Sequence, residues 1–122
     1  ARQEGRIINI TSRAAHGAYD RTSYSAAKSA LLGCTKTWAL ELAPYGITVN
    51  AISPGPTETA LLRQNCPEGS EVEQKVLSSI PLGRFAQADE IAAAVAFFLS
   101  DAAAYITGQE LLIDGGSSLI GR

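Results

Sequence analysis

The feature of this chain that most constrains its fold is the alternation of short apolar segments with longer helical ones. Segments 6–11, 47–53 and 110–113 are short, aliphatic and bounded by glycine, proline or aspartate, which is typical of buried strands. Apolar residues recur at helical spacing over 24–43 and 89–99. A chain that alternates strands with helices is expected to form an α/β fold with a parallel sheet.

The segments between these elements are predicted from turn and capping residues. Ser23 is the expected N-cap of the helix over 24–43, which should stop at Pro44 and Gly46. Segment 12–23 is rich in small and polar residues and is predicted to be a loop. Two short helices are expected over 58–65 and 71–79, separated by a break at 67–69.

Composition excludes several classes of protein. Hydrophobic residues make up 46% of the chain, charged residues 18%, and the net charge is −2, so we expect a globular protein that binds neither nucleic acid nor anionic membranes. No run approaches the roughly 20 apolar residues of a membrane span, and the polar start at 1–5 predicts no signal peptide. The isolated Cys34 and Cys66 fit a reducing compartment. We therefore expect a cytoplasmic protein.

The most informative residues for chemistry are Ser12, Tyr24 and Lys28. Tyr24 and Lys28 are four residues apart, so on a helix they share one face. A free tyrosine has a pKa of about 10. An ammonium about 4 Å away stabilises a phenolate by on the order of 4 kcal/mol at an effective dielectric of 20. Ser12 follows a strand, where side chains reach the ligand crevice of a parallel sheet, and could donate to a substrate oxygen.

Taken alone, each of these signals is weak, because a solvated Tyr–Lys pair and a polar residue after a strand are both common. Their sequence context is more specific. The chain resembles the short-chain dehydrogenases/reductases through blocks that occur in the family's order: GRIINITS at 5–12, YSAAK at 24–28, VNAISPG at 49–55, PLGR at 81–84, DEIA at 89–92 and YITGQELLIDGG at 105–116.

This resemblance implies a role for each matching residue. Ser12 matches the serine that hydrogen-bonds the substrate oxygen, Tyr24 the tyrosine that passes the proton, and Lys28 the lysine that binds the nicotinamide ribose and favours the ionised tyrosine. Pro54 and Gly55 match the turn beside the nicotinamide. Thr57 and Thr59 match positions that meet the carboxamide through a backbone amide and a side chain; an ordinary helix cap is an equal alternative for each. The implied cofactor is NAD or NADP, and no metal is expected.

The implied fold is a Rossmann-like doubly wound parallel sheet, of which this chain holds the last three strands and their helices. Chain 1–122 would be the C-terminal half of one NAD(P)-binding domain, with a catalytic segment at 5–59, a substrate lid at 60–82 and the last helix and strand at 88–116. The family's glycine-rich phosphate loop has no counterpart before Ser12. We therefore expect a missing N-terminal half, and an inactive chain in its absence.

The resemblance implies an oxidoreductase acting on an alcohol or carbonyl compound and forming a homodimer or homotetramer. Three alternatives stay open: a sugar-nucleotide epimerase or dehydratase, which shares the Tyr–Lys pair; a non-catalytic Rossmann-like binding or regulatory module; and an inactive fragment. Residues Leu61, Leu62, Val76 and Leu77 suggest a partly apolar lid.

Four further features are given structural or secondary roles. His16 is the only histidine and is expected to be a solvated loop residue. Tyr19 has Ser23 rather than a lysine four residues on, so it does not match the acid–base pattern. Arg84 is expected to form a salt bridge or a cap. Trp38 and the small residues near it are expected in the core or a subunit contact; they are Ala27, Ala30 and Cys34.

Overall fold

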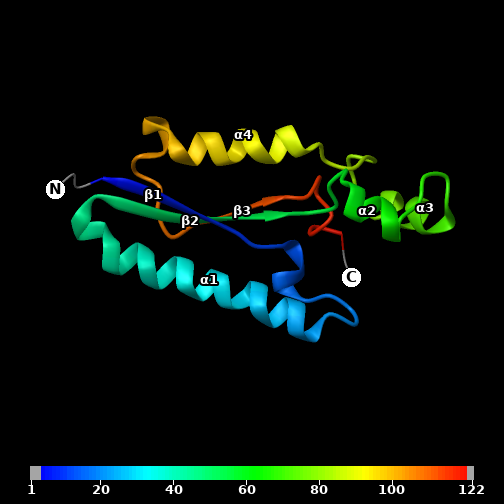
Figure 1. Cartoon of the computed structure of the whole chain (residues 1–122), viewed down its shortest axis with the longest axis horizontal. Helices are drawn as coiled ribbons and strands as arrows, with labels where there is room; N and C mark the ends of the chain where they lie inside the picture. The colour runs from blue at the N-terminus through cyan, green and yellow to red at the C-terminus, as the bar shows by residue number, and fades with distance from the viewer. Residues whose placement is uncertain (1–3, 121–122) are drawn as a thin grey trace.

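The computed structural model describes residues 4–120; residues 1–3, part of the polar start, and residues 121–122 lie outside the described residues. A parallel sheet forms the middle layer, with one long helix on each face (Figure 1). The elements are β1 (Gly5–Ile10), η1 (Arg13–His16), α1 (Thr22–Leu42), η2 (Ala43–Tyr45), β2 (Ile47–Pro54), α2 (Ala60–Asn65), α3 (Glu71–Ser78), α4 (Ala88–Leu99), η3 (Asp101–Ala103) and β3 (Glu110–Ile113).

The sheet has three strands in the order β1-β2-β3, all parallel. Gly5 pairs with Ile47 at one end of the β1–β2 ladder, and Ala51 pairs with Glu110 at the start of the β2–β3 ladder. Central strand β2 is buried at every position from 48 to 53, as expected for a parallel strand covered on both faces. The predicted α/β fold with a parallel sheet is confirmed.

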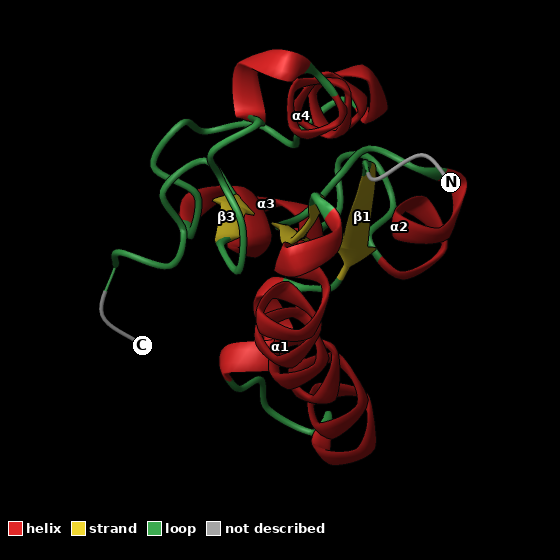
Figure 2. Ribbon diagram, turned by 90° about the vertical axis from the view of Figure 1, so that its left-hand side faces the viewer, coloured by secondary structure: helices red, strands yellow, loops and turns green. Residues whose placement is uncertain are grey.

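Helices α1 and α4 cover opposite faces of the sheet (Figure 2). On the α4 face, Ile52 and Phe98 are buried together with Ala103. On the α1 face, Thr35 and Ala39 are buried, and the Asn9 side chain donates to Thr35 Oγ1 at 2.9 Å. The two faces therefore differ, because the α4 side is apolar whereas the α1 side admits a polar bond between strand and helix.

A second, smaller core lies among α2, α3 and the turn that follows them. Cys66, Ile80 and Phe85 form its buried centre, and they are packed by Leu62, Val76 and Leu77. Three of the four leucines and valines predicted to form an apolar lid thus point into this small core. Leu61, with 69% of its surface exposed, is the one that remains open to solvent.

The predicted element ends were wrong at two helices. Helix α1 begins at Thr22, not Tyr24, because the Ser25 amide already donates to the Arg21 carbonyl at 2.7 Å. Arg21 and not Ser23 is the N-cap residue, and it makes no side-chain capping bond. Helix α2 begins at Ala60, not Glu58, because Thr59 caps it through a 3.1 Å bond from the Leu62 amide.

The predicted loop over 12–23 contains a short 3-10 helix, η1. Ser12 is its N-cap residue, with Oγ accepting the Ala14 amide at 3.1 Å. The small residues that suggested a loop therefore allow a tight turn directly after β1.

Candidate active site

Ser12 lies where β1 ends, held between β2 and α1. The preceding Thr11 is buried. Its amide donates to the Ile52 carbonyl at 2.8 Å, and its hydroxyl donates to the Lys28 carbonyl at 3.1 Å. Since Thr11 ties the end of β1 to both neighbouring elements, the backbone that carries Ser12 is fixed relative to α1.

Tyr24 and Lys28 lie one turn apart on α1, at the same end of the sheet as Ser12. Lys28 Nζ lies 5.9 Å from the centroid of the Tyr24 ring and donates to the Ile10 carbonyl at 3.2 Å. The Tyr24 side chain is open to solvent, with 41% of the residue exposed. The structure therefore brings the three predicted residues to one region, with the lysine between the ring and the end of β1.

Arg21 is a cation beside Tyr24 that the sequence patterns did not single out. Its guanidinium carbon lies 5.6 Å from the Tyr24 ring centroid. An arginine three residues before a helical tyrosine is a signal that could have found it, because i and i+3 positions are neighbours. Tyr24 thus has Arg21 and Lys28 within cation–π range of one ring.

The turn after β2 is built around a close contact between two backbones. Gly55 donates its amide to the Ile113 carbonyl at 2.8 Å. A Cβ at position 55 would lie 2.8 Å from both Cα and Cβ of Asp114, which leaves no room for a side chain. The glycine predicted to admit a nicotinamide ring is thus already required by the packing of the chain itself.

The two threonines after this turn have different bonds. The Thr57 hydroxyl donates to the Gly55 carbonyl at 3.0 Å, so it does not cap a helix. Thr59 is the N-cap of α2, which confirms the helix-cap alternative for its side chain. Pro54, Gly55, Thr57 and Thr59 follow one another along the carboxyl end of β2.

Asp114 closes the carboxyl end of β3 with an internal set of hydrogen bonds. Its Oδ1 accepts the Gly116 amide at 3.0 Å, and its Oδ2 accepts the Ser118 amide at 2.9 Å. Burial is the strongest single influence and opposes ionisation. The hydrogen bonds from Ser118 and Gly116 and the charge of Arg13 together hold the pKa of Asp114 below its usual value. Arg13 on η1 thus acts on the end of β3.

His16 is exposed, as predicted, but it ends the short helix η1 and has a carboxylate partner. Its Nε2 lies 2.8 Å and 2.9 Å from the two carboxylate oxygens of Glu110, the first residue of β3. The Ser53 hydroxyl donates to the same carboxylate. Glu110 was missed because nothing local to it predicts a partner; His16 is 94 positions away in the sequence.

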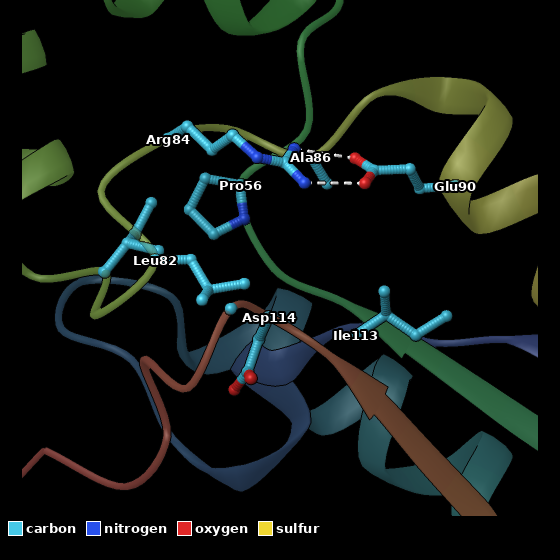
Figure 3. A pocket seen from close by; sticks show the side chains of 9 residues that line it. Pro56, Leu82, Arg84, Ala86, Glu90, Ile113 and Asp114 are labelled. Carbon is cyan, nitrogen blue, oxygen red and sulfur yellow. Dashed lines mark hydrogen bonds and ion pairs between the residues drawn. The ribbon is translucent and has the colours of Figure 1, made fainter.

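A pocket lies beyond the carboxyl ends of β2 and β3 (Figure 3), and its lining residues are Pro56, Ile80, Leu82, Arg84, Ala86, Glu90, Ile113, Asp114 and Gly115. Arg84 crosses its rim and donates to both Glu90 oxygens at 2.8 and 2.7 Å, so its predicted salt bridge is confirmed. Thr57 pairs with Ala86 through an isolated β-bridge. The pocket therefore adjoins the turn that carries Gly55, since Pro56 and Asp114 belong to its lining.

The residues at the carboxyl ends of β1 and β2 fit the nicotinamide end of a dinucleotide by the chemistry of their donor set. An ammonium, a phenol and a serine hydroxyl lie at this end of the sheet, and Lys28 donates one of its three hydrogens to the Ile10 carbonyl. Within residues 4–120, no group of three potential metal ligands is found. No helix among those residues is long and apolar enough to cross a membrane.

Similarity to known proteins agrees with this geometry. Residues 1–118 match the family model described as Enoyl-(Acyl carrier protein) reductase. The chain is 43% identical over 115 residues to the 3-oxoacyl-(acyl-carrier-protein) reductase FabG of Thermotoga maritima, covering 93% of this chain and 46% of that protein. It is 46% identical over 114 residues to the acetoacetyl-CoA reductase of Allochromatium vinosum, covering 92% of this chain and 45% of the relative.

Solved structures give the same result. A short chain dehydrogenase/reductase family protein superposes with a TM-score of 0.85 at 39% identity, over 98% of this chain and 48% of that one. An Agrobacterium tumefaciens structure with bound NADP, provisionally assigned as a 2-deoxy-d-gluconate 3-dehydrogenase, gives a TM-score of 0.89 at 38% identity, over 95% of this chain and 47% of that one. The chain thus spans about half the length of the relatives it matches, and it belongs to the short-chain dehydrogenase/reductase family.

Proposed function

We propose that the intact protein carrying this chain is an NAD(P)-dependent oxidoreductase that interconverts an alcohol and a ketone, with Tyr24 as general acid–base. One observation carries the proposal: the Lys28 ammonium lies 5.9 Å from the Tyr24 ring centroid, beside the strand end that bears Ser12. A cation beside a solvent-open phenol, close to a serine hydroxyl that can donate its hydrogen, suits proton transfer to a carbonyl oxygen.

The proton and hydrogen-bond steps follow from the residues. A nicotinamide cofactor held by Tyr24 and Lys28 would supply the hydride chemistry at the substrate carbon. In the reducing direction, Tyr24 gives its phenolic proton to the substrate oxygen as negative charge develops there, and the Lys28 ammonium stabilises the resulting phenolate. Ser12 Oγ accepts the Ala14 amide, which leaves its own hydrogen to donate to the same oxygen. In the oxidising direction, Tyr24 removes the alcohol proton.

The proposed cofactor site uses both strand ends. Tyr24 and Lys28 would bind the nicotinamide ribose, and Lys28 retains hydrogens for this beyond the one given to Ile10. Pro54 and Gly55 would lie beside the nicotinamide, with Thr57 and Thr59 near its carboxamide. The cofactor is NAD or NADP; binding of NADP by the Agrobacterium tumefaciens neighbour supports NADP as the first one to test.

We further propose that residues 1–122 are the C-terminal half of a single dinucleotide-binding domain, with segments 5–59, 60–82 and 88–116 as the catalytic segment, lid, and last helix and strand. The coverage of 46% of the Thermotoga maritima relative supports this division. The N-terminal half would supply the remaining strands and the glycine-rich loop for the cofactor phosphates.

Subunit association is proposed through α1. Trp38 is 37% exposed on this helix, and Ala27 and Ala30, 11 and 8 residues before it, are exposed on the same side of the helix. Small residues beside large apolar ones allow a second helix to pack closely. A homodimer or homotetramer in native mass spectrometry of the intact protein, dissociated by Ala30→Glu, would support this contact; a monomeric unmodified protein would contradict it.

The test is the rate of NADPH oxidation by the intact protein with acetoacetyl-CoA, the substrate named for the Allochromatium vinosum relative. Tyr24→Phe removes the proton donor and should lower kcat by roughly 100-fold to 10,000-fold, the range of general acid–base catalysis. Tyr45→Phe at the opposite end of α1 is the matched control and should leave kcat unchanged. Full activity in Tyr24→Phe would overturn the proposed acid–base; binding of NADPH without turnover of any ketone would favour a binding module.

A further inference from the structure

Three side chains from three elements meet on the α1 face of the sheet, beside but outside the residues proposed to react. His16 ends η1, Glu110 begins β3, and Ser53 lies in β2. His16 Nε2 contacts both Glu110 oxygens at 2.8 and 2.9 Å, and the Ser53 hydroxyl donates to Glu110 Oε1. Ser53 is fully buried, whereas 20% of the Glu110 side chain and 42% of the His16 side chain are exposed.

The order of these groups excludes a nucleophilic triad. The carboxylate lies between the hydroxyl and the imidazole, so His16 does not contact Ser53 and cannot take its proton as a general base. Ser53 instead donates a hydrogen bond to one Glu110 oxygen, and both carboxylate oxygens contact the His16 imidazole. The network therefore joins η1 to the sheet and performs no chemistry of its own.

Segment η1 depends on such tethers because it buries no side chain. Its backbone forms two turn bonds, from the Ala15 amide to the Ser12 carbonyl at 2.9 Å and from the Gly17 amide to the Ala14 carbonyl at 3.0 Å. These bonds make one short unit of which Ser12 is the first residue and His16 the last helical one. A displacement at His16 is thus transmitted to Ser12 through a single turn.

Other charged and polar side chains lie around the network of His16, Glu110 and Ser53. Lys36 of α1 lines the same cavity as His16 and Glu110. Arg13, at the start of η1, acts by its charge on Asp114 at the far end of β3. The Ser29 hydroxyl donates to the Ala15 carbonyl from α1. The two contacts of His16 with Glu110 join the C-terminal end of η1 to β3, so they fix how η1 lies along that strand.

We propose that His16, acting through Glu110 and Ser53, is a positioning residue that holds η1 so that the Ser12 hydroxyl points at the substrate oxygen. This inference rests on the proposed function, because it assigns Ser12 a substrate oxygen to meet. A misplacement of about 1 Å at a reacting group can cost about 100-fold in rate. Ser12 acts on developing charge, so the loss falls on kcat and much less on KM.

The experiment compares His16→Ala with His16→Gln in the intact protein, by steady-state kinetics with NADPH and acetoacetyl-CoA and by hydrogen exchange. His16→Ala should lower kcat about 10-fold, within the roughly 100-fold that such misplacement can cost, with KM changed less than twofold. The amides of Ala14, Ala15 and Gly17 should exchange faster, while those of α4 stay unchanged as the internal control. His16→Gln keeps an N–H donor for Glu110 and should recover most of kcat.

Each alternative outcome counts against the inference. If the kcat of His16→Ala is within twofold of the unmodified protein, the inference is overturned. It is also overturned if kcat falls while amide hydrogen exchange in η1 is unchanged, because the effect would then arise elsewhere. If His16→Ala does not fold, Glu110→Gln replaces it: this variant keeps an acceptor for Ser53 and should lower kcat less than Glu110→Ala. Failure of the proposed function is separate, since it would appear as full activity in Tyr24→Phe.

Discussion

Gly55 and Asp114 approach each other so closely that a Cβ on the glycine would lie 2.8 Å from the aspartate Cα. Gly55→Ala must therefore push β3 away from β2 at the point where both strands end. We expect the free energy of unfolding to fall by about 1–3 kcal/mol, the usual cost of overpacking, measured by urea denaturation of the intact protein.

Gly33→Ala is the matched control for that substitution. Gly33 lies inside α1, and a Cβ there would meet no atom within 4 Å. Replacing it with alanine should raise the free energy of unfolding by roughly 0.5–1 kcal/mol, because glycine is entropically costly inside a helix. Equal effects at the two positions would contradict the close contact at Gly55.

Thr59 allows capping to be separated from a cofactor contact. Its Oγ1 accepts the Leu62 amide at the start of α2. Thr59→Ala should lower the free energy of unfolding by about 1 kcal/mol, as for other lost N-caps, and Thr59→Ser should restore it. The KM for NADPH, measured in both variants, tests the proposed carboxamide contact: an unchanged KM in Thr59→Ala would leave Thr59 with the cap alone.

The Arg84–Glu90 pair predicts a pH dependence of stability. The hydrogen bonds from the Arg84 side chain and the Gln87 amide lower the pKa of Glu90 from 4.5 to about 2. A lowered folded-state pKa means that the contribution is complete above about pH 4.5 and is lost as the pH falls through about 2. The pair is exposed, so the contribution should be small.

Urea midpoints between pH 5 and pH 2 provide the measurement. We expect stability to fall less steeply with acidification in Glu90→Gln than in the unmodified protein, because that variant has no carboxylate to protonate at this position. Parallel curves for the two proteins would contradict the role given to Glu90.

The chain of 122 residues, expressed by itself, should bind NADPH weakly and turn over acetoacetyl-CoA far more slowly than the intact protein. It offers the nicotinamide end of the proposed site, whereas we propose that the amides that would cradle a pyrophosphate lie in the N-terminal half. Fluorescence titration with NADPH measures the binding. Equal affinity for the two forms would contradict the proposed division of the domain.

Sequence patterns predicted the strands well and helix starts less well. Strand β3 matched at both ends, because Asp114 and the glycines after it stop an aliphatic run. The start of α1 was misplaced because Ser23 is a favoured cap by type, while the backbone bond that begins the helix is set by Arg21. Capping preferences describe averages, and the loop before the helix decides the individual case.

The candidate site was also predictable from the sequence only in part. Tyr24 and Lys28 were predictable because an i, i+4 spacing defines a helix face from sequence alone. The contact between His16 and Glu110 was not, since it joins two elements that are adjacent only after the sheet has formed. Gly55 was singled out for a close approach to a nicotinamide ring, whereas the close approach in the structure is to Asp114, directly after β3, which no pattern around Gly55 indicates.

The sheet register also determines when this site can be completed during synthesis. Strand β1 can pair with β2 only after β2 has been made, since Gly5 meets Ile47, and the β2–β3 ladder forms later still, since Ala51 meets Glu110. A ribosome adding about 5–20 residues per second therefore releases Ser12, Tyr24 and Ser53 before the carboxylate that anchors η1. If His16 positions Ser12 as proposed, we expect Ser12 to gain its final orientation only after β3 has been synthesised and Glu110 has met His16.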